Sequence, residues 1–192
     1  WNNNFTWAKW VTPSRDLISA FKQEGDEVRF KESIVYYDCN WSNYYPSDNY
    51  PFMYKCRSAN SSIIKYRYAD VLLLKAEALI MQDTPDLEGA ADIIDKVRDR
   101  AKLGALPTSV RSNKNAMLNA LLKERRLELA FEGQRWFDLV RLDKVEEVMN
   151  AVYAKDSGRK AQIYTFDKNS YRLPIPQSVI DANDKIHQNP GY

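Results

Sequence analysis

The feature that most constrains this fold is a pair of apolar segments joined by a very short link. Residues 63–82 are apolar around most of the circumference of a helix, and residues 85–104 repeat apolar side chains at helical spacing. Residues 83–85, Asp-Thr-Pro, mark the break, so the two helices must lie antiparallel as a hairpin. A helix like that over 63–82 is expected to be buried between neighbours. Only one such unit is visible, so a self-sufficient solenoid is not indicated.

The second constraint is a dense lattice of Glu and Arg in residues 124–141. Helices are expected over about 113–132 and 134–153, with Gly133 as a kink or C-cap between them. Three side chains on the inward stripe of these helices are assigned a structural role: Arg125, Glu132 and Trp136. An unpaired inward charge is costly, so we expect internal ion-pair bracing. The remaining charges are expected to pair along the surface: Glu124, Arg126, Glu128 and Arg135.

The flanking segments predict smaller elements. Residues 12–24 favour a helix with Thr12 as N-cap and Gly25 as a left-handed C-cap, and residues 28–37 favour a strand. Toward the end of the chain, residues 162–166 and 171–176 are expected to be extended around a turn at 167–170. Ser178 and Asp181 are expected to cap a single helical turn reciprocally.

Charge and hydropathy exclude two broad classes of partner. The 28 basic and 26 acidic residues are mixed along the chain and leave a net charge of only +2, which argues against nucleic-acid binding. No stretch approaches ~20 consecutive apolar residues, as a membrane-spanning helix requires. The chain opens at Trp1 without a basic or apolar leader, and we expect it to be a fragment of a longer protein. Cys39 and Cys56 form a possible disulfide; the alternative is two free thiols.

The strongest candidate for a binding site is the aromatic loop at residues 36–56, where rings alternate with Asn, Ser and Asp. A flat ring can cover the apolar face of a sugar while short amide or carboxylate side chains reach its hydroxyls. Tyr36, Phe52 and Tyr54 are expected to pack the loop against the core instead. The N-terminal residues 1–10 have a similar mixture. The candidate glycan-binding residues are Trp41, Tyr44, Tyr45, Tyr50, Asn43, Asp48, Trp7 and Trp10.

Catalytic and cofactor signatures are sparse. His187 is the single histidine, which offers no zinc-ligand spacing, and the six glycines form no phosphate-binding loop. Asp38 and Asp48 flank the aromatic loop, but acidic residues are common enough for such a pair to arise by accident. We therefore expect no catalytic residues, no metal and no cofactor.

Four pieces of the sequence resemble the SusD/RagB family, in the family's order. They are "TPSRDLISAFKQEGDEVRF", "YRYADVLLLKAEAL", "ERRLELAFEGQRWFDLVR" and "LPIPQSVIDANDKIHQNPGY". The resemblance implies that residues 1–192 are the C-terminal part of a mainly α protein, with tetratricopeptide-like hairpins in a helical core at 63–153, irregular loops and a few short β-strands.

The same resemblance implies a function. Members of the family are non-catalytic surface lipoproteins that bind oligosaccharides or polysaccharides and deliver them to a SusC-type TonB-dependent outer-membrane transporter. The lipid anchor would lie upstream of this chain. The family's motifs belong to its scaffold, so the resemblance assigns no sugar-contacting residue. The alternative is a helical-repeat protein–protein adaptor, which would expose a contiguous apolar patch instead of rings edged by amides.

Overall fold

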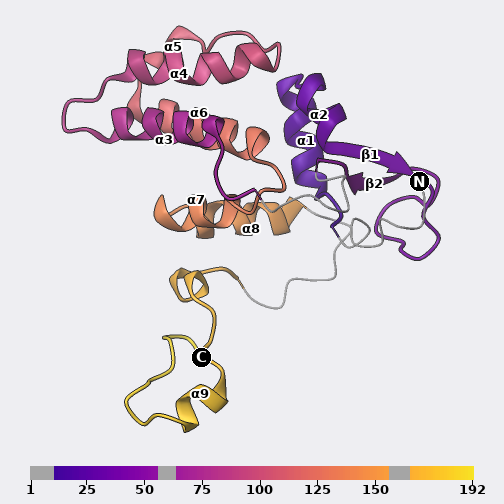
Figure 1. Cartoon of the computed structure of the whole chain (residues 1–192), viewed down its shortest axis with the longest axis vertical. Helices are drawn as coiled ribbons and strands as arrows, with labels where there is room; N and C mark the ends of the chain where they lie inside the picture. The colour runs from indigo at the N-terminus through magenta and orange to yellow at the C-terminus, as the bar shows by residue number, and fades with distance from the viewer. Residues whose placement is uncertain (1–10, 56–63, 156–164) are drawn as a thin grey trace. The chain divides into compact units, whose positions relative to one another are not determined.

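The computed structural model describes residues 11–55, 64–155 and 165–192. It divides into two compact units, residues 1–135 and 136–192, each of which is described by itself. The expected helical core at 63–153 therefore extends across both units. The chain is mainly helical, as predicted, and Figure 1 shows its elements.

The core of the first unit is a three-helix layer. Helices α3 (Tyr68–Met81) and α4 (Leu87–Arg100) form the predicted hairpin, and α6 (Lys114–Glu128) packs against both (Figure 1). The short helix α5 (Thr108–Arg111) follows Pro107 and was not predicted. The buried side chains between the helices include several small ones, which let the axes approach closely: Leu73, Ala76, Ile80, Ala90, Ala91, Ile94, Met117 and Leu121.

One face of α3 departs from the expectation of a helix buried all round. Tyr68 is 76% exposed, Val71 54% and Met81 53%, while Leu73 and Ala76 on the opposite face are fully buried. The uniform hydrophobicity of this segment therefore hides a helix with one covered face and one open apolar face in this structure. Residues 64–67, which were expected to be helical, precede the helix instead.

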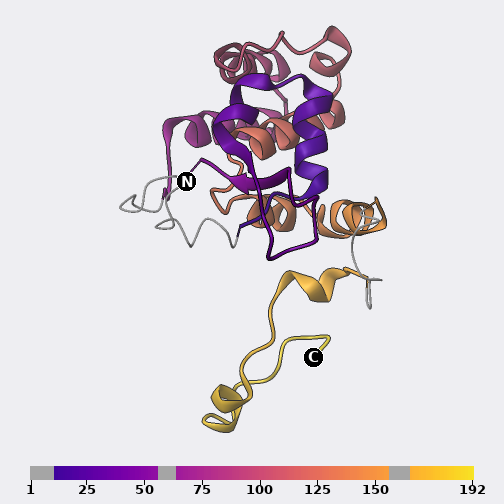
Figure 2. The ribbon, with the colours of Figure 1, turned by 90° about the vertical axis from the view of Figure 1, so that its right-hand side faces the viewer.

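Two helices and a hairpin precede this core. Helix α1 (Arg15–Glu24) is capped by the Ser14 side chain rather than by Thr12, and it ends at Gly25 in the predicted left-handed conformation, φ 69°. Residues 27–33 form a second helix, α2 (Glu27–Ser33), where a strand was expected. The reason is Asp26, whose carboxylate caps the helix by accepting from the Arg29 backbone N–H. Helices α1 and α2 contact each other, and α2 contacts the strand that follows it in the chain (Figure 2).

The strand prediction holds for the last four residues only. Strand β1 (Ile34–Tyr37) pairs antiparallel with β2 (Tyr50–Met53), with Ile34 opposite Met53 and Tyr37 opposite Tyr50. Strand β2 is buried along its whole length. The pair thus fixes both ends of the aromatic loop, whose intervening residues are 38–49.

An ion-pair cluster ties α6 to the other segments of the first unit. Arg125 is 2% exposed, and its Nη1 lies 2.9 Å from Oδ1 of Asp70 in α3. Glu124 and Glu128 are also buried, at 2% each, so their expected place on the surface is wrong. Sequence periodicity could not reveal this, because their partner Arg29 approaches from α2, nearly a hundred residues earlier in the chain.

Glu128 is the centre of this cluster and also marks the end of α6. Its carboxylate accepts hydrogen bonds from Arg29, Arg67 and Arg100, and its backbone carbonyl accepts from Lys55 Nζ at 2.7 Å and Arg67 Nη2 at 2.6 Å. Burial raises the pKa of the Glu128 carboxyl, but hydrogen bonds from Arg67 and Arg100 outweigh it and hold this pKa below its usual value. The helix ends four residues earlier than predicted, where cations of other segments satisfy the carbonyl of its last residue.

Glu132 lies beyond the end of α6 but belongs to the same cluster. Its side chain is 3% exposed and pairs with Lys55 Nζ at 2.5 Å and Arg67 Nε at 2.7 Å. The chain turns here through two residues with positive φ, Phe131 at 67° and Gly133 at 78°. Gly133 therefore lies in a turn after the helix rather than at a kink within it.

The second unit is built from short elements. The helix expected over 134–153 is divided into α7 (Arg135–Arg141) and α8 (Val145–Lys155), with Asp143 at φ 53° between them. The 3₁₀ helix η2 (Lys168–Tyr171) and α9 (Gln177–Asp181) follow. Trp136, half-buried, packs edge-on against Phe166 with ring centroids 6.4 Å apart.

The extended runs of the second unit do not pair with each other among the described residues. Instead, Asn150 bonds both backbone groups of Phe166 at 2.9 Å, and Gln188 bonds both backbone groups of Ile175 at 2.8 and 2.9 Å. Two amide side chains thus replace a partner strand. Residues 162–164 of the first expected run lie outside the described part.

The two turn predictions of this unit had different outcomes. Asp167 caps η2 with a full capping box, so the turn expected at 167–170 is present as a 3₁₀ helix. The reciprocal cap expected between Ser178 and Asp181 is wrong, because the N-cap of α9 is Pro176 and Asp181 accepts from Gln177 Nε2 at 2.8 Å. In the three described stretches of the chain, no helix has both the length and the apolar character needed to cross a bilayer.

Candidate functional site

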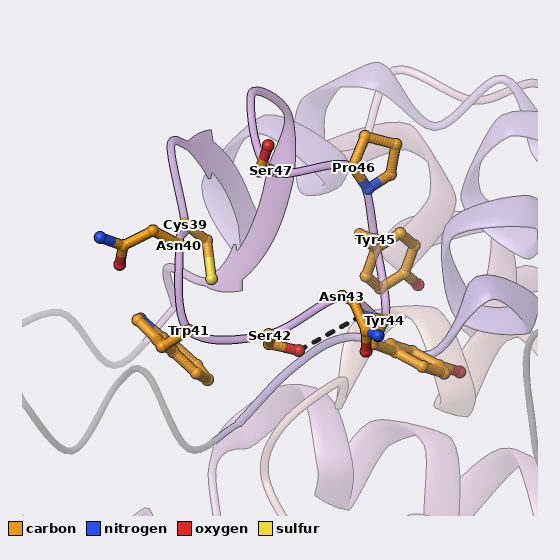
Figure 3. A pocket seen from close by; sticks show the side chains of 9 residues that line it. All are labelled: Cys39, Asn40, Trp41, Ser42, Asn43, Tyr44, Tyr45, Pro46 and Ser47. Carbon is orange, nitrogen blue, oxygen red and sulfur yellow. Dashed lines mark hydrogen bonds between the residues drawn. The ribbon is translucent and has the colours of Figure 1, made fainter.

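The aromatic loop between β1 and β2 forms an open pocket of about 870 Å³. Its described lining is one continuous stretch of chain, Cys39 to Ser47 (Figure 3). The Cys39 backbone N–H donates to the Ser47 carbonyl at 2.6 Å, so the two ends of this stretch are fastened to each other just beyond the strands. A backbone hydrogen bond therefore closes the loop at its base.

Trp41 presents the most accessible ring of the loop. It is 52% exposed, and it rests on Tyr50 and Phe52 with ring centroids 5.8 and 6.3 Å away. Asn40 and Asn43 are exposed, and Figure 3 shows Asn40 beside Trp41 on one side of the loop. One edge of the pocket thus combines a supported flat ring with an amide side chain.

Tyr44 and Tyr45 lie on the opposite side of the loop (Figure 3), where they pack edge to face at 4.9 Å. The guanidinium of Arg15 lies over both rings, 4.0 Å from the Tyr44 centroid and 4.7 Å from the Tyr45 centroid. Arg15 also donates to the Tyr44 carbonyl, and the Tyr45 hydroxyl donates to the Pro13 carbonyl at 2.8 Å. These cation–π contacts and hydrogen bonds hold the loop against the start of α1.

Tyr50 is a supporting residue rather than an exposed platform. It is 2% exposed, and its hydroxyl forms hydrogen bonds with Ser42 Oγ at 2.9 Å and Thr12 Oγ1 at 3.4 Å. Its ring is surrounded by those of Trp41, Tyr45 and Phe52. The expectation that Tyr50 offers a face to a ligand is therefore wrong, because its ring and its hydroxyl are both occupied.

The other sequence candidates fall into three groups. Asn43 lines the pocket, whereas Asp48 is exposed just outside its lining. Trp7 and Trp10 lie outside the described residues. Cys39 carries a buried thiol, and Cys56, its possible disulfide partner, lies outside the described residues.

Sequence reasoning missed the residues at the start of α1 and just before it that hold the loop. Thr12, Pro13 and Arg15 contact it from about thirty residues upstream. An Arg in the first turn of an amphipathic helix is typical of a solvent-exposed position, and no sequence signal connects it to two tyrosines.

A second cavity, of about 490 Å³, lies over the ion-pair cluster and is lined mainly by charged side chains. Most of these charges are engaged with one another, as in the pairing of Arg67 with Glu128 and Glu132. Burial raises the pKa of Glu124 despite its contact with Arg29, and burial lowers the pKa of Lys55 despite its pairing with Glu132. Perturbed pKa values here accompany structural ion pairs.

Metal-binding groups were sought in the same described stretches. No cluster of three or more His, Cys, Asp or Glu side chains that could hold a metal ion lies among them. The pocket lining supplies rings, amides and hydroxyls. Such an arrangement can hold a ligand by stacking and hydrogen bonding.

Known proteins of one family resemble this chain in sequence and in overall fold. The chain is 35% identical over 143 residues to SusD-like protein P2 of Formosa agariphila, covering 71% of this chain and 27% of that protein. A SusD superfamily protein from Bacteroides vulgatus shares the fold with a TM-score of 0.68 at 22% identity, covering 94% of this chain and 44% of that one. A laminarin-binding SusD-like protein gives a TM-score of 0.62 at 26% identity, covering 94% and 38%.

Two facts follow from these matches. The chain spans about a quarter of the length of the curated relative and less than half of the two solved structures. The model of the SusD family matches residues 47–192, which include β2, all the helices from α3 onward and the charged residues of α6. This chain belongs to the SusD family.

Proposed function

We propose that this chain is the part of a cell-surface protein that binds an oligosaccharide or polysaccharide without chemical conversion, for import through a SusC-type TonB-dependent transporter of the outer membrane. The observation that carries the proposal is Trp41, a half-exposed ring held over a tethered loop and edged by the Asn40 amide. A sugar would stack its C–H face on this ring and bond its hydroxyls to the neighbouring amides. A SusD-like neighbour is described as laminarin-binding, which supports the same class of ligand.

The tethering of the loop supports this proposal energetically. Ordering a flexible loop on binding costs about 0.5–1.5 kcal/mol for each immobilised rotamer-rich side chain. Here Tyr45, Arg15 and Tyr50 fix the loop through contacts within the chain. Little of the binding free energy would then be spent on ordering.

Calorimetric titration of the purified chain with a panel of oligosaccharides, laminarin included, tests the proposal. Trp41→Ala should weaken binding of any active sugar at least about tenfold, as expected for a central aromatic anchor. The matched control is Phe137→Ala, which removes a 65% exposed ring from the second unit and should leave affinity unchanged. A folded chain that binds no sugar, or binding that survives loss of Trp41, would contradict the proposed site.

A second candidate function is that of a helical adaptor that binds protein through the open face of α3. The observation in its favour is the apolar row Tyr68, Val71, Leu74 and Met81, all of it exposed. Because this alternative includes no sugar site, the chain should bind none of the oligosaccharides of the panel, and Val71→Glu should abolish its co-purification with a SusC-type transporter. Retained co-purification would argue against this use of the face.

A further inference from the structure

The aromatic loop combines an uncharged lining with an acidic rim. The nine described residues that line it include no Asp, Glu, Lys or Arg. Its polar groups are the amides of Asn40 and Asn43 and the hydroxyls of Ser42, Ser47 and the tyrosines. Amides and hydroxyls both donate and accept, which suits the hydroxyl groups of a neutral sugar.

The rim carries two carboxylates at the base of the loop. Asp38 and Asp48 adjoin Cys39 and Ser47, the two residues joined by the 2.6 Å backbone hydrogen bond, so this bond brings the two acids to the same end of the pocket. Both are exposed. An anionic ligand entering the pocket would meet two like charges there.

A basic side chain does contact the loop, but it binds the rings and backbone of the loop from outside the pocket. Arg15 lies over the rings of Tyr44 and Tyr45 and donates to the Tyr44 carbonyl. Arg15 does not line the pocket among the described residues. A sulfate or uronate bound there would therefore leave its charge without the bidentate Arg partner that such groups usually receive.

We propose that this loop selects uncharged glycans and discriminates against glycans that carry carboxylate or sulfate groups. The inference rests on the proposed function and specifies its substrate class. Selectivity would arise from both halves of the site: stacking and hydrogen bonds favour the neutral sugar, and Asp38 with Asp48 disfavours the anionic one.

The test compares neutral and anionic glycans of similar backbone in calorimetric titrations at low salt. Suitable pairs are laminarin with sulfated laminarin, agarose with carrageenan oligosaccharides, and xylan with glucuronoxylan. The neutral member of at least one pair should bind, and its anionic partner should bind at least about tenfold more weakly. Added salt should narrow the difference, since it screens exposed charges.

Two double variants separate the rim from a general change in net charge. Asp38→Asn with Asp48→Asn should strengthen binding of the anionic member and so narrow the ratio of neutral to anionic affinity. Asp83→Asn with Asp99→Asn removes the same charge from exposed positions on the α3–α4 hairpin and should leave that ratio unchanged.

The outcomes distinguish this inference from the function on which it rests. Equal or tighter binding of the anionic glycan, lost in Trp41→Ala, would overturn the neutral selectivity and leave glycan binding at the loop in place. An unchanged ratio in the Asp38 and Asp48 variant would overturn the role of the rim. No binding by any member of any pair would refute the proposed function, and the inference with it.

Discussion

Replacing Arg125 by methionine should destabilise the first unit strongly, because it leaves the Asp70 carboxylate buried without its cation. Asp70 is 3% exposed, and its Oδ1 lies 2.9 Å from Arg125 Nη1. Breaking a buried pair by removing one partner costs about 3–5 kcal/mol, a large fraction of the 5–15 kcal/mol typical of a domain. Methionine keeps much of the apolar stem of arginine, so lost packing contributes little.

A double-mutant cycle separates this charge effect from packing. Asp70→Leu alone should cost a similar amount, since it removes the carboxylate that lies 2.9 Å from the buried Arg125 guanidinium. The double variant Arg125→Met with Asp70→Leu should cost several kcal/mol less than the sum of the two, because neither member of this pair is then left buried without the other.

Urea unfolding followed by far-ultraviolet circular dichroism measures these free energies. The matched control is Lys31→Met, which breaks a pair with Glu27 whose side chains are 73% and 75% exposed. That variant should cost less than about 0.5 kcal/mol. A loss below about 1 kcal/mol for Arg125→Met, or additive costs in the double variant, would refute the bracing role of the buried pair.

Three further predictions concern other described residues. Glu128→Gln should cost about 1.5–3 kcal/mol at neutral pH, because its carboxylate accepts charged hydrogen bonds from three arginines. Since the pKa of this carboxyl is lowered in the folded chain, the stability is present above the usual Glu pKa and is lost as the pH falls through the folded pKa. The free energy of urea unfolding should therefore fall less steeply at acid pH in the variant, and an unchanged acid dependence would contradict the lowered pKa. The hydrogen bond to Asp143 raises the pKa of Tyr171 to about 12. The contribution of this bond to stability is therefore present below the usual tyrosine pKa and is lost as the pH rises through about 12. Absorbance titration should show a tyrosinate step near this pH that moves to lower pH in Asp143→Asn, and an unmoved step would exclude this bond. Gly133→Ala should cost about 1–2 kcal/mol, because alanine would have to adopt the left-handed φ of 78°. Steric contact adds nothing, since open space surrounds the position where a Cβ would lie. Thermal unfolding that matches the parent chain would refute this left-handed conformation.

Sequence patterns predicted the helical scaffold well where one face of a helix determines its environment. The α3–α4 hairpin and α6 follow from spacing alone, and so does the inward position of Arg125. Glu124 and Glu128 were misplaced because their burial depends on Arg29 and Arg67, which reach α6 from distant segments. Tertiary partners of that kind leave no periodic signal.

The aromatic loop stood out by its composition, but its internal arrangement was not predictable. Residue types marked the loop as aromatic and amide-rich. Which rings face solvent depends on individual contacts: the Tyr50 hydroxyl finds Ser42 and Thr12, while Trp41 is left half-exposed. Arg15 was missed for the same reason, since its contacts with Tyr44 and Tyr45 join segments that lie far apart in the sequence.

The ion-pair cluster of α6 and the aromatic loop are built from different segments of the first unit, and this has an evolutionary consequence. Glu128 and its partners brace α6 against α2 and α3, whereas the pocket lining from Cys39 to Ser47 lies on a connection closed at its base by one backbone hydrogen bond. Under the proposed function, substitutions in that connection would alter ligand preference while the braced helices stay intact. Relatives that share the charged helical motifs would then differ in the glycan they bind without differing in fold, and identity along α6 would say little about glycan specificity.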